Sequence, residues 1–192
     1  SKKNPSEIDK PKELPKISFN IPSKLKQLLV FIRRDVLAKL SNTQYLIINF
    51  LEAPILAFIL SFIIKYYNES ESNEIGYTLL GNSNLPVYIF MSVIVAIFMG
   101  LTISAEEIIK DRKILKREAF LNLSWSSYLV SKIFVLITLS AIQAALFVIV
   151  GNSILNIKGM YIHYWIILFS CWVSANMMGL VISDSFKTVV TI

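Results

Sequence analysis

Residues 104–132 have the sequence SAEEIIKDRKILKREAFLNLSWSSYLVSK, and this stretch decides how the rest of the chain is interpreted. Nine charged residues lie between Glu106 and Glu118. The flanking segments are apolar over about 20 residues each, the length of helix that crosses a bilayer core of about 30 Å. We therefore expect a charged helix at 106–118 and a shorter helix or turn at 119–127, which together connect two membrane-spanning helices.

The composition of the whole chain also favours a membrane protein. Of its 192 residues 55% are hydrophobic and only 17% are charged. In soluble domains, by comparison, about a quarter of all residues are charged. The net charge is +6, but the basic residues lie beside apolar segments, where anionic lipid explains them without nucleic acid. The single cysteine, Cys171, excludes a disulfide within the chain and any cysteine-based metal spacing. We expect a lipid bilayer as the surroundings, and neither nucleic acid nor metal as a ligand.

Hydropathy predicts an all-α, polytopic membrane protein. Its membrane domain covers residues 43–187, and its predicted spans are residues 45–64, 87–105, 128–150 and 161–182. Residues 1–22 contain four prolines among polar and charged residues, which is typical of a flexible linker or tail. Residues 188–192 are apolar again and are predicted to begin a further span.

Residues 23–42 are predicted to form an amphipathic helix before the first span. Apolar side chains recur at spacings of three and four residues from Leu25 to Leu40, as on one face of a helix. The charged residues lie mainly on the opposite face: Lys26, Arg33, Arg34 and Asp35. Such a helix is expected to lie along the membrane surface. The alternative is an ordinary surface helix of a soluble domain.

The positions of Lys and Arg predict the orientation in the membrane. Most of them precede the first span or lie in residues 106–132, whereas the two other loops carry one lysine each, Lys65 and Lys158. Basic loops remain on the cytoplasmic side. The N-terminus and the 106–127 loop are therefore predicted to be cytoplasmic, in a plasma membrane or a bacterial inner membrane.

Polar residues inside the predicted spans are candidates for function. Glu52 lies in the first span, where a carboxylate is costly in lipid, so we expect it to face other helices or water. It contributes either to a substrate path or polar relay, or to a hydrogen bond that packs helices near the membrane boundary. Gln143 and the only histidine, His163, lie in other segments and have no partner at the spacing of a catalytic triad. No catalytic residue is predicted.

The charge spacing in the 106–118 helix predicts a partner outside it. Glu106 and Lys110 form a favourable pair four residues apart, but two further pairs at this spacing are like-charged and repel each other. These pairs are Arg112 with Lys116 and Lys113 with Arg117. Because a self-sufficient surface helix would not have this pattern, acidic groups of a partner are expected against it.

The order of these elements resembles the transmembrane domain of G-subfamily (White-type) ABC transporters, which has the ABC-2 permease fold. The motif A-E-E-x-x-x-D-R-K-x-x-x-R-E occupies residues 105–118, and S-x-S-S-Y at 124–128 precedes the third span. The similarity extends over about residues 25–187. By resemblance, 23–42 is the connecting helix and 106–127 is the hairpin that transmits ATP-driven motion.

The resemblance implies six spans, so the four seen here would belong to a truncated permease. It also implies a nucleotide-binding domain, in cis or in trans, and a homodimer or pseudo-dimer. The sequence has no G-x-x-x-x-G-K-[ST] loop, so ATP and Mg would bind to that other domain and no cofactor to this chain. The residues implied in coupling are Glu106, Asp111, Arg112, Lys113, Lys116, Arg117 and Glu118.

The resemblance further implies that Ser92, Ala96 and Met99 line a central cavity for an amphipathic or lipid-like substrate. One alternative function is a membrane anchor or scaffold that docks a soluble partner through the 106–127 hairpin without transport. An intramembrane enzyme is less favoured, because no HExxH, GxSxG or paired aspartates occur. The ATP-hydrolysing activity would lie in the complete transporter.

Overall fold

The computed structural model describes residues 23–66, 84–118, 124–157 and 159–186, apart from the side chains of residues 66 and 118. These residues form six α-helices and no strand. The helices are α1 (Lys24–Ser41), α2 (Thr43–Tyr66), α3 (Asn84–Ala105), α4 (Glu107–Glu118), α5 (Trp125–Ile154) and α6 (Tyr161–Ser185). The prediction of an all-α fold is confirmed.

Four segments of the described chain are long and apolar enough to cross a membrane, which confirms the polytopic class. They are α2, α5, α6 and the segment 84–117, in which a turn at Glu106 separates the apolar α3 from the charged α4. Each apolar helix contains one of the segments predicted as spans. Pro54 lies inside α2 without ending it.

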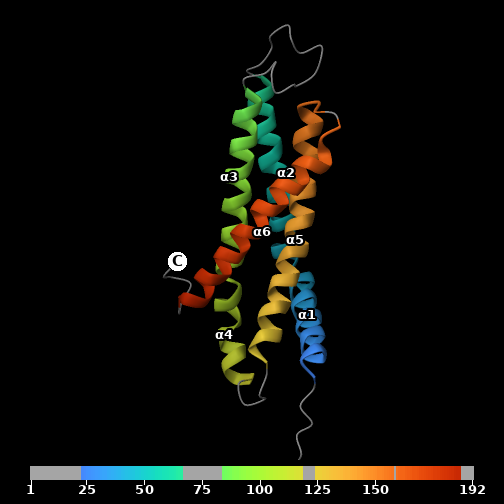
Figure 1. Cartoon of the computed structure of the whole chain (residues 1–192). Coiled ribbons are helices and arrows are strands. Elements are labelled where there is room, and N and C mark those ends of the chain that lie inside the picture. The colour runs from blue at the N-terminus through green and yellow to red at the C-terminus, as the bar shows by residue number, and fades with distance from the viewer. Residues whose placement is uncertain (1–22, 67–83, 119–123, 158, 187–192) are drawn as a thin grey trace, which may run out of the picture.

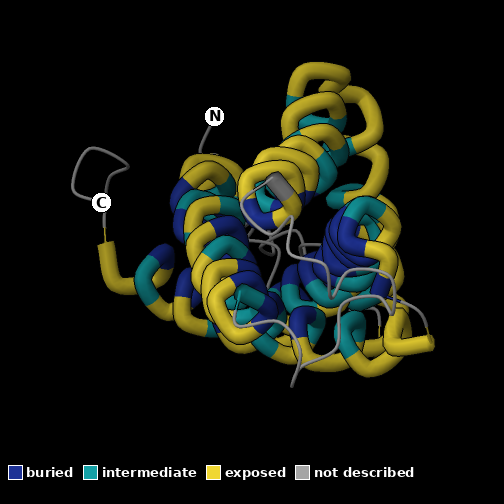
Figure 2. Tube along the Cα trace, turned by 90° about the horizontal axis from the view of Figure 1, so that it is seen from above, coloured by how far each residue is buried: buried dark blue, intermediate teal, exposed yellow. Residues whose placement is uncertain are grey.

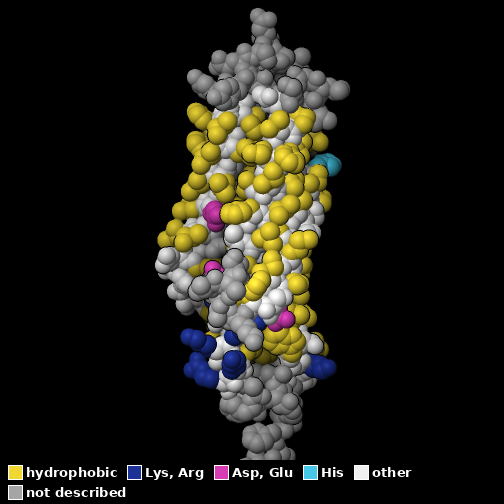
Figure 3. Space-filling model, turned by 90° about the vertical axis from the view of Figure 1, so that its left-hand side faces the viewer, with side chains coloured by type: hydrophobic (Ala, Val, Ile, Leu, Met, Phe, Trp, Pro, Cys, Tyr) yellow, Lys and Arg dark blue, Asp and Glu magenta, His cyan; other side chains and the backbone are white. Residues whose placement is uncertain are grey.

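The helices form two groups that pack against each other through α5 and α6. In one group α3 and α6 make the most extensive contact, and α4 also packs on α6; in the other, α2 and α1 pack on α5. Figure 1 shows α1 and α4 at the same end of the bundle. Lys and Arg gather at this end, below a band of hydrophobic side chains (Figure 3). We call it the basic end.

The core of the bundle lies where the two groups of helices meet. Figure 2 shows buried positions turned toward the inside of the bundle and exposed positions turned outward. Trp172 of α6 packs edge-on against Phe147 of α5, with ring centroids 6.2 Å apart. Both side chains are fully buried, as are Met99 of α3 and Ala53 of α2. The spans therefore pack as one body through large side chains contributed by several helices.

Helices α3 and α6 approach each other closely at small residues. A Cβ atom on Gly179 would lie 1.8 Å from Oγ of Ser104, and one on Gly100 would lie 2.7 Å from Cβ of Ala175. Small residues allow helix backbones to approach in this way inside a membrane. The two helices are consequently fixed in one register.

Helix α1 packs against the first turns of α5 and leaves an apolar face exposed. Gln27 and Phe31 are buried in the contact, whereas Leu25 and Leu29 are 73% and 66% exposed. Asp35, expected among the polar residues of the opposite face, turns toward α5 and binds Lys132. In the structure α1 runs along the long axis of the bundle beside the start of α5 (Figure 1), and its position relative to the membrane surface stays a prediction.

Candidate functional site

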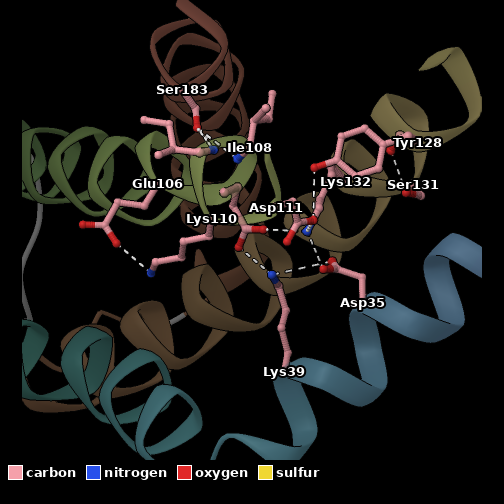
Figure 4. A network of polar contacts seen from close by, with 12 residues as sticks. Asp35, Lys39, Glu106, Ile108, Lys110, Asp111, Tyr128, Ser131, Lys132 and Ser183 are labelled. Carbon is pink, nitrogen blue, oxygen red and sulfur yellow. Dashed lines mark hydrogen bonds and ion pairs between the residues drawn. The ribbon is translucent and has the colours of Figure 1, made fainter. Parts of the chain in front are cut away.

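Five charged residues from three helices meet at the basic end of the bundle (Figure 4). We call them the ionic cluster: Asp35 and Lys39 of α1, Glu107 and Asp111 of α4, and Lys132 of α5. Nζ of Lys132 lies 2.5 Å from Asp35, 3.0 Å from Glu107 and 2.9 Å from Asp111. Nζ of Lys39 lies 2.5 Å from the other oxygen of Glu107 and 3.6 Å from Asp35. The cluster therefore joins α1, α4 and α5 directly.

The pairing of α1 with α5 brings Asp35 to Lys132. Ser124 donates its backbone N–H to Oε1 of Gln27 at 2.9 Å. One turn further along, the ring of Phe31 meets that of Tyr128 at 5.8 Å in an edge-on contact. A third step of four residues on both helices gives the Asp35–Lys132 ion pair. Because contacts recur every four residues on both helices, α1 and the start of α5 run parallel in a fixed register.

The ions of the cluster are largely removed from water. The side chains of Lys132 and Glu107 are 4% and 8% exposed, and that of Asp35 is 11% exposed. Burial costs several kcal/mol per ion, and a partner recovers this cost only when it is held in good geometry. The hydroxyl of Tyr128 also donates to Asp111 at 3.1 Å. The cluster is thus evidence for one specific arrangement of three helices rather than for added stability.

The electrostatics of Glu107 follow from its position between two ammonium groups. Glu107 begins α4, beyond the apolar residues of α3. Burial by itself would raise the pKa of Glu107, but Lys39 and Lys132 outweigh this effect and hold the pKa below its ordinary value. Glu107 is therefore ionised at neutral pH.

Helix α4 has a second face that turns away from the cluster. Lys113, Lys116 and Arg117 are exposed; we call these three residues the outer basic face. Within the described part of the chain no carboxylate forms an ion pair with them. Lys110 also points outward, but it pairs with Glu106 at 2.6 Å. The outer basic face is thus available to a partner, while Glu107 and Asp111 bind within the chain.

The last turn of α6 holds the start of α4. Oγ of Ser183 accepts hydrogen bonds from the backbone N–H groups of Ile108 at 2.9 Å and Ile109 at 3.2 Å. In return, the guanidinium of Arg112 donates to the backbone carbonyl of Asp184. Figure 4 shows Ser183 directed at the backbone near Ile108, on the far side of α4 from Asp35.

The charged helix α4 is thus held by α1, α5 and α6 at the basic end of a bundle of four apolar helices. A family model described as ABC-2 type transporter matches residues 26–192. The chain belongs to this family. No curated protein and no solved structure matches the chain. The chain is therefore a transmembrane component of an ABC-type transporter, and ABC-2 permeases normally pair with an ATPase component.

The residues expected to couple this ABC-2 permease to its ATPase fall into different environments. Asp111 lies in the ionic cluster, Arg112 binds α6 and Glu106 pairs with Lys110. The other expected coupling residues are the outer basic face and Glu118, whose side chain lies outside the described part of the structure. Their contact with an ATPase stays a prediction.

The residues expected to line a cavity in the permease are packed inside the bundle. Ala96 and Met99 are fully buried, and Ser92 is 1% exposed with its hydroxyl donating to the carbonyl of Tyr88. Cavity lining by these residues stays a prediction. In this conformation it would require α3 to separate from its neighbours.

Polar side chains inside the spans make mainly structural contacts. Gln143 of α5 donates to the backbone carbonyl of Asn49 in α2 at 3.1 Å, and Asn176 of α6 donates to Ser140 at 2.6 Å. Glu52 is half-buried on α2, and no described residue forms a hydrogen bond or ion pair with its carboxylate. Its role in a substrate path or polar relay, or in a hydrogen bond that packs helices, stays a prediction.

Sequence reasoning missed four members of the ionic cluster: Asp35, Lys39, Glu107 and Lys132. Two signals were present in the sequence. Asp35 and Lys39, like Glu107 and Asp111, are spaced four residues apart and so share one face of a helix. Lys132 is the only charged residue of α5. Among the described residues no group of three or more His, Cys, Asp or Glu could hold a metal ion.

Proposed function

We propose that this chain is the membrane part of a G-subfamily-like (White-type) ABC transporter, and that an ATP-hydrolysing domain docks on the outer basic face of α4. The observation that carries the proposal is the division of α4 into two faces. Its acidic residues Glu107 and Asp111 bind lysines of α1 and α5, while Lys113, Lys116 and Arg117 remain exposed.

The ionic cluster connects α4 to α5 and α1, so a displacement of α4 would also displace helices of the bundle. A partner that binds the outer basic face and closes on ATP would displace α4. Because Glu107 binds both Lys132 and Lys39, α5 and α1 would be displaced with it. Packed interfaces of this kind transmit rigid-body shifts because they are not continuously deformable.

The proposal includes the surroundings of the chain. The basic end would face the cytoplasm, since Lys and Arg concentrate there and basic segments remain on that side. ATP and Mg would be bound by the partner, in cis or in trans, and two membrane parts would assemble around a path for an amphipathic or lipid-like substrate. A membrane anchor without transport is the competing outcome of the test below.

The test is charge reversal on the outer basic face of the intact transporter. The triple variant Lys113→Glu, Lys116→Glu, Arg117→Glu is expected to lower the vanadate-sensitive ATP hydrolysis that purifies with the chain by about tenfold or more, since each exposed ion pair contributes roughly 0.2–1 kcal/mol and reversal turns attraction into repulsion. Arg112 is left intact because it holds α6.

A matched control carries the same kind of change elsewhere at the basic end. Lys26 and Arg33 are exposed on α1, and Lys26→Glu with Arg33→Glu is expected to keep the hydrolysis rate. Unchanged hydrolysis in the triple variant would exclude docking on this face. If the native chain purifies with no ATP hydrolysis at all, the anchor function is favoured.

A further inference from the structure

The junction between α3 and α4 is bridged by α6 in one unbroken register. Along α6, Ala175 contacts Gly100, Gly179 contacts Ser104, and Ser183 accepts from the backbone of Ile108. Each step is four residues on both sides. The first two contacts lie on α3 and the third on α4, so the same face of α6 continues past the turn at Glu106.

Ser183 caps the N-terminus of α4, a role that normally belongs to the residue just before the helix. The first N–H groups of a helix have no partner within the helix and are usually satisfied by the side chain just before it. Here the residue before α4 is Glu106, and its carboxylate pairs with Lys110 at 2.6 Å. The hydroxyl that satisfies Ile108 and Ile109 comes from another span and is fully buried.

The contact is reciprocal, because α4 also satisfies the end of α6. The last carbonyl groups of a helix likewise lack partners within it, and the carbonyl of Asp184, next to the last residue of α6, accepts from the guanidinium of Arg112. Three hydrogen bonds, all donated by α4 and accepted by α6, therefore fix the end of one helix to the start of the other.

We infer that α6 splints the turn at Glu106, and that Ser183 is the positioning residue that makes α3, α4 and α6 move as one lever. Without the splint, the turn at Glu106 would let α4 pivot while α3 stays in place. With it, displacement of α4 reaches α6 directly and not only through α5. That ATP hydrolysis by a partner moves this lever rests on the proposed function. The splint does not, because it is inferred from contacts within the chain.

The splint is tested by spin-label distances in the full chain in lipid nanodiscs. With Cys171→Ala as background, labels at the exposed positions Ile114 of α4 and Met178 of α6 are expected to give one narrow distance distribution. Ser183→Ala leaves two N–H groups without their acceptor, so displaced α4 conformers should become about tenfold more populated and broaden the distribution.

Further variants separate the splint from general damage to the fold. Ser185→Ala removes a hydroxyl from the same helix end, but this hydroxyl is exposed and bonds only within α6, so the distribution should stay narrow. Ser183→Thr keeps the hydroxyl and should restore the narrow distribution, whereas Arg112→Gln should broaden it. If Ser183→Ala gives a distribution as narrow as Ser185→Ala, there is no splint. If Ser183→Ala does not fold, the distance distribution of Arg112→Gln is compared with that of Ser185→Ala instead. Equally narrow distributions then show that there is no splint.

The lever is tested in the intact transporter with its ATPase component. Labels at Met178 of α6 and at the exposed Ile59 of α2, a helix that contributes no residue to the ionic cluster or to the splint, should change their distance when Mg·ATP and vanadate are added, and Ser183→Ala should remove most of that change. A full change in Ser183→Ala overturns the lever. The absence of any change in the unsubstituted transporter contradicts the proposed function, while the nanodisc measurement still decides the splint.

Discussion

Removal of the ammonium at the centre of the ionic cluster is expected to destabilise the chain strongly. In Lys132→Met, three carboxylates lose a partner that lies within 3.0 Å of each of them. Leaving a buried charge without its partner costs about 3–5 kcal/mol. The lower end of this range applies, because Lys39 remains near Glu107 and Asp35 and Tyr128 still donates to Asp111.

The loss is measured as a shift in the thermal unfolding midpoint of the detergent-solubilised chain, followed by tryptophan fluorescence. For a protein of this size about 1 kcal/mol corresponds to roughly 2–4 °C, so about 3 kcal/mol predicts a decrease of about 6–12 °C. Lys110→Met is the matched control, because it removes an ammonium that is 63% exposed and pairs with the 41% exposed Glu106. Such exposed pairs contribute at most about 1 kcal/mol.

Two results would refute this reasoning. Equal midpoints for Lys132→Met and Lys110→Met would mean that the cluster carries no energetic coupling. The second result concerns Asp111, which loses its ammonium in Lys132→Met. Adding Asp111→Leu to that variant removes the uncompensated carboxylate and should recover part of the midpoint. A further decrease in the double variant would show that the cost does not arise from unpaired charge.

Two further predictions concern Glu107 of the ionic cluster and the close approach of α3 and α6. Because Lys39 and Lys132 hold the pKa of Glu107 below its ordinary value of 4.5, the stabilisation from its ionised form is complete at neutral pH and is lost only as the pH falls below 4.5 toward the folded pKa. Glu107→Gln should therefore flatten the dependence of the unfolding midpoint on acid pH, and an unaltered acid dependence would assign it to other carboxylates. Gly179→Ala places a Cβ atom 1.8 Å from Oγ of Ser104 and 3.1 Å from the carbonyl of Leu101, so α3 and α6 must separate at a cost of about 1–3 kcal/mol. Thermal unfolding measures this cost, with the exposed Ser174→Ala as the control, and equal midpoints for the two variants would contradict the close approach.

The class of fold could be predicted because it depends on local properties of the sequence. Runs of about 20 apolar residues define α2, α3, α5 and α6, since only helices satisfy the backbone inside lipid. The A-E-E-x-x-x-D-R-K-x-x-x-R-E motif at 105–118 identified the ABC-2 permease fold, and the family match confirms it. Both signals can be read without knowing which residues meet in space.

The candidate site could be predicted only in part because its partners are distant in the chain. Asp35 and Lys132 meet because α1 and α5 pack in a particular register, and nothing local to either residue specifies that register. The interpretation of the like-charged pairs also changes. Arg112 was expected to repel Lys116 unless an external acid compensated it, but its guanidinium turns to the end of α6. Backbone carbonyl groups can take the place of an acidic partner, and charge spacing alone does not reveal them.

The ionic cluster also implies an order of assembly during synthesis of the chain. Chains are made from the N-terminus, so Asp35 and Lys39 appear well before Lys132 and can first pair only with each other, at 3.6 Å on adjacent turns of α1. Glu107 and Asp111 arrive next and bring two more carboxylates to one lysine. Lys132, which lies within 3.0 Å of all three carboxylates, is added only when the start of α5 has been made. A nascent chain that stops before residue 132 therefore has only one lysine for the three carboxylates of the cluster, and α1 can take its final place only after the third span begins.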